Sequence, residues 1–252
     1  MFEYLWLLPL GFVAGVIGSM IGLGGGFVVV PVLTFFGYSP TLAASDSLFA
    51  AFSNSVASTA SYARQKRIVY SLGIKLALIS IPGTIIGAYV SDAVSPPLFK
   101  LLFGAVLVSS GVYIYMRRKM EAREHNLSKQ IMVLAVGASF FAGIISSFFG
   151  IGGGTVFVPL MVVAIGLSMK LAAPTSQFIL MFAAASGMIV HSLLGHPNYY
   201  EAGMLSIGSF VGGMVGSRLS TRVNEGKLRL FVVIVLGITA AKLVIDALTS
   251  HG

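Results

Sequence analysis

The chain has 252 residues, of which 56% are hydrophobic and only 10% are charged, with a net charge of +8. A soluble domain carries about 25% charged residues, so the composition excludes a soluble protein and indicates one that crosses a lipid bilayer several times. No cysteine occurs, which excludes disulfides, thiolate metal sites and cysteine-based transfer of sulfur groups.

The first half of the chain begins with an interrupted apolar region at 5–37. Its start, MFEYLWLL, has no basic segment, so we do not expect a cleaved signal peptide. At 22–33 the sequence GLGGGFVVVPVL places three consecutive glycines and a proline inside the hydrophobic stretch. Gly costs about 1 kcal/mol and Pro about 3 kcal/mol relative to Ala in a helix interior, so we expect the helix to break there. A helix of small and polar residues at 41–62 and two further helices, at about 70–90 and 97–116, complete this half.

The second half repeats this order. GIGGGTVFVPLM at 150–161 matches the first motif at seven of twelve positions, displaced by 128 residues. LAAPTSQF at 171–178 likewise echoes LAASDSLF at 42–49. The expected elements of this half are another broken region, a helix of small and polar residues and two last helices, at 131–167, 171–194, 201–218 and 228–248. We therefore divide the chain into a first repeat, a charged cytoplasmic linker and a second repeat, at 1–116, 117–129 and 130–252.

The charges of the loops predict how the repeats are oriented. RQKR at 64–67, the linker at 117–129 and the loop at 218–229 are rich in Lys and Arg, whereas 91–97 and 195–200 have neither. Basic loops remain in the cytoplasm, so equivalent loops of the two halves face opposite sides. Each half then crosses an odd number of times, either because its broken region crosses three times or because it crosses once and adds a re-entrant hairpin. The expected fold is an all-α polytopic membrane protein with two inverted-topology repeats, with broken or re-entrant helices at the Gly-rich motifs.

The glycine motifs are candidates for an anion site. Glycine permits positive φ and close approach of the backbone to a ligand, and a helix that restarts after a break presents unpaired N–H groups with partial positive charge. The alternative is that these glycines only let helices pack closely, which is the role we expect for the GxxxG pairs Gly83/Gly87 and Gly212/Gly216. The candidate substrate-binding residues are Gly24, Gly25, Gly26, Ser47, Asn54, Gly152, Gly153, Gly154, Thr175, Ser176 and Gln177.

Polar residues surround the motifs. ASDS at 44–47 and APTS at 173–176 contain helix N-cap types, so each is expected to open a helix toward the centre. Ser47, Asn54, Ser58 and Ser61 then share one helical face, which lines a pore or bonds to neighbouring helices. Asp46 is the one acid near this centre, and an ionisable group inside a membrane is a functional candidate. Its two alternatives are a coupling site for a transported cation and an N-cap.

The paired GxGGG-x-x-x-x-P segments, each followed by a polar turn and a helix, resemble the sulfite exporter TauE/SafE family over nearly the whole chain. The resemblance implies a membrane transporter of sulfite, sulfonates or related sulfur anions. The family's glycine motifs and polar turns fall on Gly22, Gly24, Gly25, Gly26, Gly150, Gly152, Gly153, Gly154, Asp46, Ser47, Thr175 and Ser176. At Asp46 the chain departs from the many members that have Thr, and a carboxylate there repels an anion unless it is protonated or turned away.

The expected function is therefore secondary export of a small sulfur-containing anion, such as sulfite or sulfoacetate, through a central site between the repeats. The alternative is a channel or a proton-coupled uptake carrier for another small anion. We find no nucleophile–base pair and no metal-ligand pattern, so we expect no enzyme, no catalytic residue, no metal and no cofactor. The expected partners are the lipid bilayer of the inner membrane and the anionic substrate, without nucleic acid, and a homo-oligomer stays open.

Overall fold

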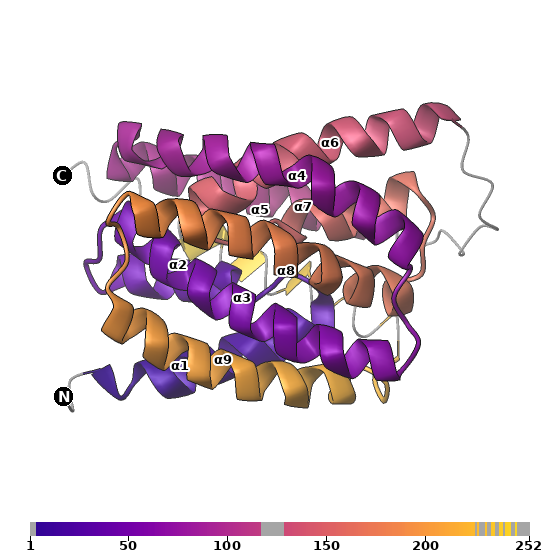
Figure 1. The fold of residues 1–252 in the computed structure, drawn as a ribbon, viewed down its shortest axis with the longest axis horizontal. Coiled ribbons are helices and arrows are strands. Elements are labelled where there is room, and N and C mark those ends of the chain that lie inside the picture. The colour runs from indigo at the N-terminus through magenta and orange to yellow at the C-terminus, as the bar shows by residue number, and fades with distance from the viewer. Residues whose placement is uncertain are drawn as a thin grey trace.

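The computed structural model describes residues 4–116, 129–224 and, beyond these, 226, 230, 233, 234, 237, 238, 240–242 and 245. Within these residues the fold is built from helices (Figure 1). They are, in chain order, α1 (Leu7–Ile21), α2 (Gly26–Phe35), α3 (Pro40–Arg64), α4 (Tyr70–Val90), the 3-10 turn η2 (Ser91–Ala93), α5 (Pro96–Met116), α6 (Lys129–Phe149), α7 (Gly154–Pro159), the π-helical turn η3 (Leu160–Ala164), α8 (Met169–Leu193) and α9 (Tyr199–Leu219). Residues 117–128 of the expected linker at 117–129 and most of the expected last helix at 228–248 lie outside the described residues, and Lys129 already belongs to α6.

Each broken apolar region forms a helical hairpin. α1 ends at Gly22, which adopts the left-handed conformation with φ +80°, and α2 begins four residues later. The ring of Trp6 at the start of α1 lies 4.8 Å from the ring of Phe36 at the end of α2, so α2 returns along α1 instead of continuing it. In the second half, α7 and η3 likewise pack back on α6. Sequence patterns left the course of the chain at these breaks open, and the ring contact identifies a hairpin.

The long helices pack in pairs, and each pair contains one helix from each half of the chain. α1 lies against α9 and α6 against α4, while α3 packs on α9 and α8 on α4. α3 and α8 also contact one another and run through the middle of the molecule in Figure 1, between the α1–α9 pair and the α4–α6 pair. Each of the long helices therefore has its main partner in the other half, whereas α2 and α7 pack mainly on helices of their own half.

Two of these helices, α4 and α8, are individually long and apolar enough to cross a membrane. α3 is equally long, but its polar residues lower its hydropathy, and the hairpins divide the remaining apolar sequence into shorter helices. The apolar faces of α4, α6 and α9 carry exposed Ile, Val, Leu and Phe side chains, which is the surface that a lipid environment favours.

Small residues allow the paired helices to approach closely. A Cβ atom added to Gly83 would collide with the carbonyl oxygen of Phe140, and one added to Gly212 would collide with that of Phe12. Gly87 and Gly216 are equally crowded by the same partner helices. The packing role expected for both GxxxG pairs is thus confirmed.

The expected N-cap role of the polar turns is wrong. α3 begins at Pro40, where the Ser39 side chain accepts a hydrogen bond from the backbone N–H of Leu42 at 3.3 Å. α8 begins at Met169 after Ser168. ASDS and APTS therefore lie inside these helices, because Ser-Pro and Ser-Met start the helices one turn or more earlier.

Candidate functional site

The two glycine motifs pack directly against each other at the centre of the molecule. Gly24 and Gly152 have positive φ, and both motifs are fully buried. A Cβ atom added to Gly26 would collide with the carbonyl oxygen of Gly150, and one added to Gly154 would collide with that of Gly22. The same contact thus occurs twice with the two halves exchanged.

A serine on each long helix holds the break of the other half. Ser47 Oγ on α3 donates to the carbonyl oxygen of Gly150 at 2.8 Å. Ser176 Oγ on α8 donates to that of Gly22 at 2.6 Å. The structure therefore brings the predicted serines and the predicted glycine motifs together.

The backbone N–H groups at the restarts of the helices have no such partner. Within the described residues, the N–H groups of Gly25, Gly26 and Phe27 donate to no acceptor, and neither do those of Gly153 and Gly154. The hydroxyl of Thr155, in the first turn of α7, is also buried without a partner. Buried donors that lack acceptors are costly, and donors at a helix start are suited to bind an anion.

Two apolar side chains, which the sequence analysis did not single out, pack against both motifs. A Cβ atom on Gly152 would lie 3.2 Å from Leu180 Cδ2 and 3.4 Å from Ala51 Cβ. Gly24 faces the same two side chains. Leu180 and Ala51 occupy equivalent positions of α8 and α3, so their equal spacing in the repeat is a signal that could have identified them.

The predicted polar residues of α3 and α8 bond across the centre. Gln177 Nε2 donates to the carbonyl oxygen of Gly18 at 2.8 Å, and its Oε1 accepts from Ser58 Oγ at 3.2 Å. Asn54 is 0% exposed, and neither its Nδ2 nor its Oδ1 has a partner within the described residues. Asn54 is therefore a polar group with unused hydrogen-bonding capacity on α3, and its Oδ1 lies against Gly213 of α9.

Asp46 and Thr175, which occupy equivalent positions, each contact the start of a helix from the other half. Asp46 Oδ1 accepts from the backbone N–H of Asn198, just before α9, at 3.0 Å. Thr175 Oγ1 accepts from that of Val69, just before α4, at 3.0 Å. The two side chains thus satisfy backbone donors at the ends of neighbouring helices rather than facing the glycine motifs.

A second acid, Glu201, lies beside Asp46 and was missed in the sequence. Asn198 Nδ2 donates to Glu201 Oε1 at 2.8 Å, so one asparagine contacts both carboxyl groups. Asp46 is 0% exposed and Glu201 only 4% exposed. The one sequence signal for Glu201 is its place in the first turn of a predicted membrane helix, where an acid is rare.

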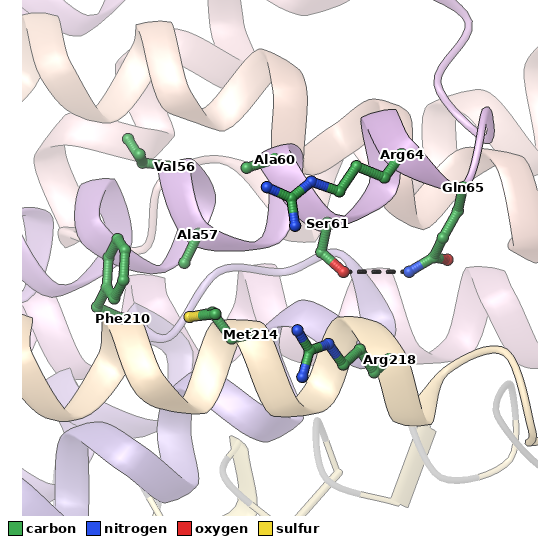
Figure 2. A pocket seen from close by; sticks show the side chains of 9 residues that line it. All are labelled: Val56, Ala57, Ala60, Ser61, Arg64, Gln65, Phe210, Met214 and Arg218. Carbon is green, nitrogen blue, oxygen red and sulfur yellow. Dashed lines mark hydrogen bonds between the residues drawn. The ribbon is translucent and has the colours of Figure 1, made fainter.

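At the opposite end of the molecule, a cavity of about 420 Å³ lies between α3 and α9 (Figure 2). The guanidinium groups of Arg64 and Arg218 both extend into it. Ser61 and Gln65 stand beside them, joined by a hydrogen bond of 3.1 Å from Gln65 Nε2 to Ser61 Oγ. Sequence analysis used these arginines only as topology signals, because nothing local shows that two loops far apart in the chain meet.

Comparison with known proteins gives this arrangement its context. The family model described as sulfite exporter TauE/SafE matches residues 7–243. The probable membrane transporter protein YunE of Bacillus subtilis is 28% identical, covering 98% of this chain and 100% of its own length. A probable membrane transporter protein of Methanocaldococcus jannaschii is 29% identical over 94% of this chain and 95% of its own. The probable membrane transporter protein YfcA of Escherichia coli K12 is 25% identical over 95% and 87%.

These relatives are named as transporters rather than enzymes, and the match extends across both glycine motifs and both long central helices. The chain therefore belongs to the sulfite exporter TauE/SafE family of membrane transporters.

Proposed function

We propose that this protein exports a small sulfur-containing anion, such as sulfite or a sulfonate like sulfoacetate, through a central site between its two halves. The observation that carries the proposal is the pair of helix restarts at Gly26 and Gly154, whose buried N–H groups have no acceptor within the described residues. An oxyanion accepts several hydrogen bonds at once, so it can satisfy donors that water cannot reach. The hydroxyl of Thr155, in the first turn of α7, and the amide of Asn54 on α3 add buried polar groups that have no partner in the described part of the chain.

The proposed membrane arrangement is a pair of inverted repeats in a multi-pass inner-membrane protein. α1 and α2 have 15 and 10 residues, or about 22 and 15 Å, so neither spans a hydrocarbon core of about 30 Å. Because the contact of Trp6 with Phe36 brings both hairpin ends together, we take the hairpin as re-entrant. α3, α4 and α5 then cross three times, which is the odd number that inversion requires. The exchanged pairing of helices supports the same arrangement.

The proposed direction of transport follows from the position of the basic residues. Arg67 Nη1 donates to Ser220 Oγ at 3.0 Å and Arg67 Nε donates to the carbonyl oxygen of Lys170 at 3.0 Å. The basic loops of both halves therefore lie at one end, which the positive-inside rule assigns to the cytoplasm. A negative interior drives an anion outward by about 2.3 kcal/mol per charge per 100 mV, so export needs no coupled cation.

Proton-coupled uptake is the second candidate, and one observation favours it. Asp46 and Glu201 form a buried carboxyl pair around Asn198 at the end opposite the arginines. Two neighbouring carboxylates are unfavourable in a site of low dielectric constant, so this pair can hold a proton that a coupled carrier would move.

The test is flux in proteoliposomes that contain the purified chain. Sulfite, sulfoacetate, sulfate and thiosulfate are each loaded inside, and efflux is compared with empty liposomes under an imposed membrane potential. We expect efflux of sulfite or sulfoacetate that is faster when the potential drives anions out. No efflux of any of the four anions, or efflux that follows a pH gradient and ignores voltage, would reject voltage-driven export.

Orientation is tested by single cysteines, for which the native chain gives no background because it has none. Cysteines that replace the exposed residues Lys66 and Thr221 should react with an impermeant thiol reagent only from the cytoplasmic side. Those that replace the exposed residues Ser95 and Tyr200 should react from outside. Labelling of Thr221 and Tyr200 positions from the same side would contradict inverted repeats.

A further inference from the structure

The cavity between α3 and α9 has two chemically different walls. At the end of the helices it presents two guanidinium groups, those of Arg64 and Arg218. Further along it is apolar, lined by Val56, Ala57 and the side chains of Phe210 and Met214. Val56 lies eight residues before Arg64, or about 12 Å along the helix. The cavity thus runs from a cationic mouth to an apolar interior.

Within the part of the chain that the structure describes, the cationic mouth has no carboxylate partner. Neither Arg64 nor Arg218 donates to a carboxylate within the described residues, and both side chains are exposed. Gln65 does not supply the missing acceptor, because its Oε1 accepts from Arg67 Nη1 at 3.0 Å. Two guanidinium groups that extend into one cavity repel each other unless an anion lies between them. The site therefore fits a ligand with a negative group that can accept from both.

A second groove adjoins the first and shares Gln65 and Arg218 with it. It measures about 580 Å³, and its other lining residues are Val215, Leu219, Thr221 and Arg222. The outward side chains between the two grooves are substantially exposed, as the values of 37% for Met214 and 43% for Val215 show. One cationic centre thus borders two grooves, the first with an apolar interior and the second with an apolar wall of Val215 and Leu219 beside Thr221 and Arg222.

We propose that this paired groove binds an anionic phospholipid, with the phosphate between Arg64 and Arg218 and one acyl chain in each groove. A guanidinium fork matches phosphate oxygens in a bidentate manner, and clusters of basic residues at the membrane surface attract anionic lipids. A cavity of about 420 Å³ is in the size range of sites for ligands much larger than sulfite. The apolar interior of the first groove and the Val215–Leu219 wall of the second each suit an acyl chain, whereas a small oxyanion needs neither. This proposal depends on the proposed membrane orientation only for the leaflet from which the lipid binds, which is the cytoplasmic leaflet.

The test measures lipid binding to the purified full chain without using transport. Native mass spectrometry with equimolar phosphatidylglycerol and phosphatidylcholine reports which lipid is retained, and thermal unfolding in detergent reports which one stabilises. We expect preferential retention of phosphatidylglycerol, and a loss of this preference by about tenfold in Arg64→Gln/Arg218→Gln, since two charge-assisted contacts are removed. Lys170→Gln, which removes one charge at the same end away from the grooves, should keep the preference.

Three outcomes would overturn the proposal. The first is equal retention of both lipids by the native chain, and the second is an unchanged preference in the double variant. The third is displacement of phosphatidylglycerol by millimolar sulfite or sulfoacetate, which would make the cavity a loading site for the transported anion. If the double variant does not fold, Arg218→Gln and Arg218→Lys provide the same comparison, because only the first removes the charge. Failure of sulfur-anion export in liposomes leaves all of these readouts intact.

Discussion

Replacement of Asn54 by leucine tests whether this residue binds the transported anion, because transport should fall while the stability of the fold does not. The side chain of Asn54 is 0% exposed, and both polar atoms of its amide lack partners among the residues that the structure describes. A buried polar group without a hydrogen bond costs about 1–3 kcal/mol. Leucine removes that cost and keeps the branching of the side chain, and fitting its larger methyl groups costs about 1 kcal/mol. We therefore expect Asn54→Leu to leave the free energy of unfolding unchanged or to raise it by up to about 2 kcal/mol.

Transport should nevertheless fall. A hydrogen bond to a charged ligand contributes about 1.5–3 kcal/mol, which corresponds to roughly a 10- to 100-fold loss of flux when it is removed. Thermal unfolding in detergent should show a midpoint that is unchanged or raised by up to about 8 °C, while efflux from proteoliposomes falls. Thr59→Val is the matched control, because Thr59 Oγ1 is also buried without a partner on α3 but lies outside the polar face of Ser47, Asn54 and Ser58. It should keep both transport and stability.

Normal efflux in Asn54→Leu would refute the assignment of Asn54 to the anion path. A fall in the unfolding midpoint with normal efflux would show instead that the amide has a structural partner. Equal losses of flux in Asn54→Leu and Thr59→Val would show that the assay responds to any change in α3.

Two further predictions concern the same centre. Gly26→Ala should abolish efflux and reduce the yield of monodisperse protein in size-exclusion chromatography, because the new Cβ atom collides with the carbonyl oxygen of Gly150. Gly25→Ala is the control and should retain both efflux and yield. Gly25 has φ −78°, and its Cβ atom would meet only ordinary contacts, the nearest at 3.5 Å. Equal behaviour of the two variants would contradict the close packing of the motifs. Asp46→Asn should keep at least partial efflux that a negative-inside potential accelerates, because the amide oxygen of asparagine can still accept from the N–H of Asn198. Complete loss of transport, with native flux that follows the pH gradient, would assign proton coupling to Asp46.

Several features of this protein follow from local sequence physics. The helix breaks at Gly22 and Gly150 were predictable, because a cluster of glycines is unfavourable in the interior of a helix. Ser47 and Ser176 were predictable as central residues from the doubled pattern alone, and the structure places each against the opposite glycine motif. The predicted bounds of the helices were also close to the observed ones: the helix predicted at 41–62 is α3, which extends over Pro40–Arg64.

Features that depend on contacts between distant residues were decided only by the tertiary structure. Whether α2 continues or reverses α1 depends on the packing of Phe36 on Trp6, and both courses suit the same hydrophobic pattern. Asp46 was interpreted either as a coupling site or as a cap of its own helix, but its Oδ1 accepts from the N–H of Asn198, 152 residues away.

The same holds for Glu201 and for the arginine cavity, which no periodicity predicts. Hydrophobicity and backbone strain act over a few residues and can therefore be read along the chain. The partner of a buried polar group is set by how the two halves dock. In this protein the docking, not the repeat itself, decides which donors at the glycine breaks are satisfied and which are left for a ligand.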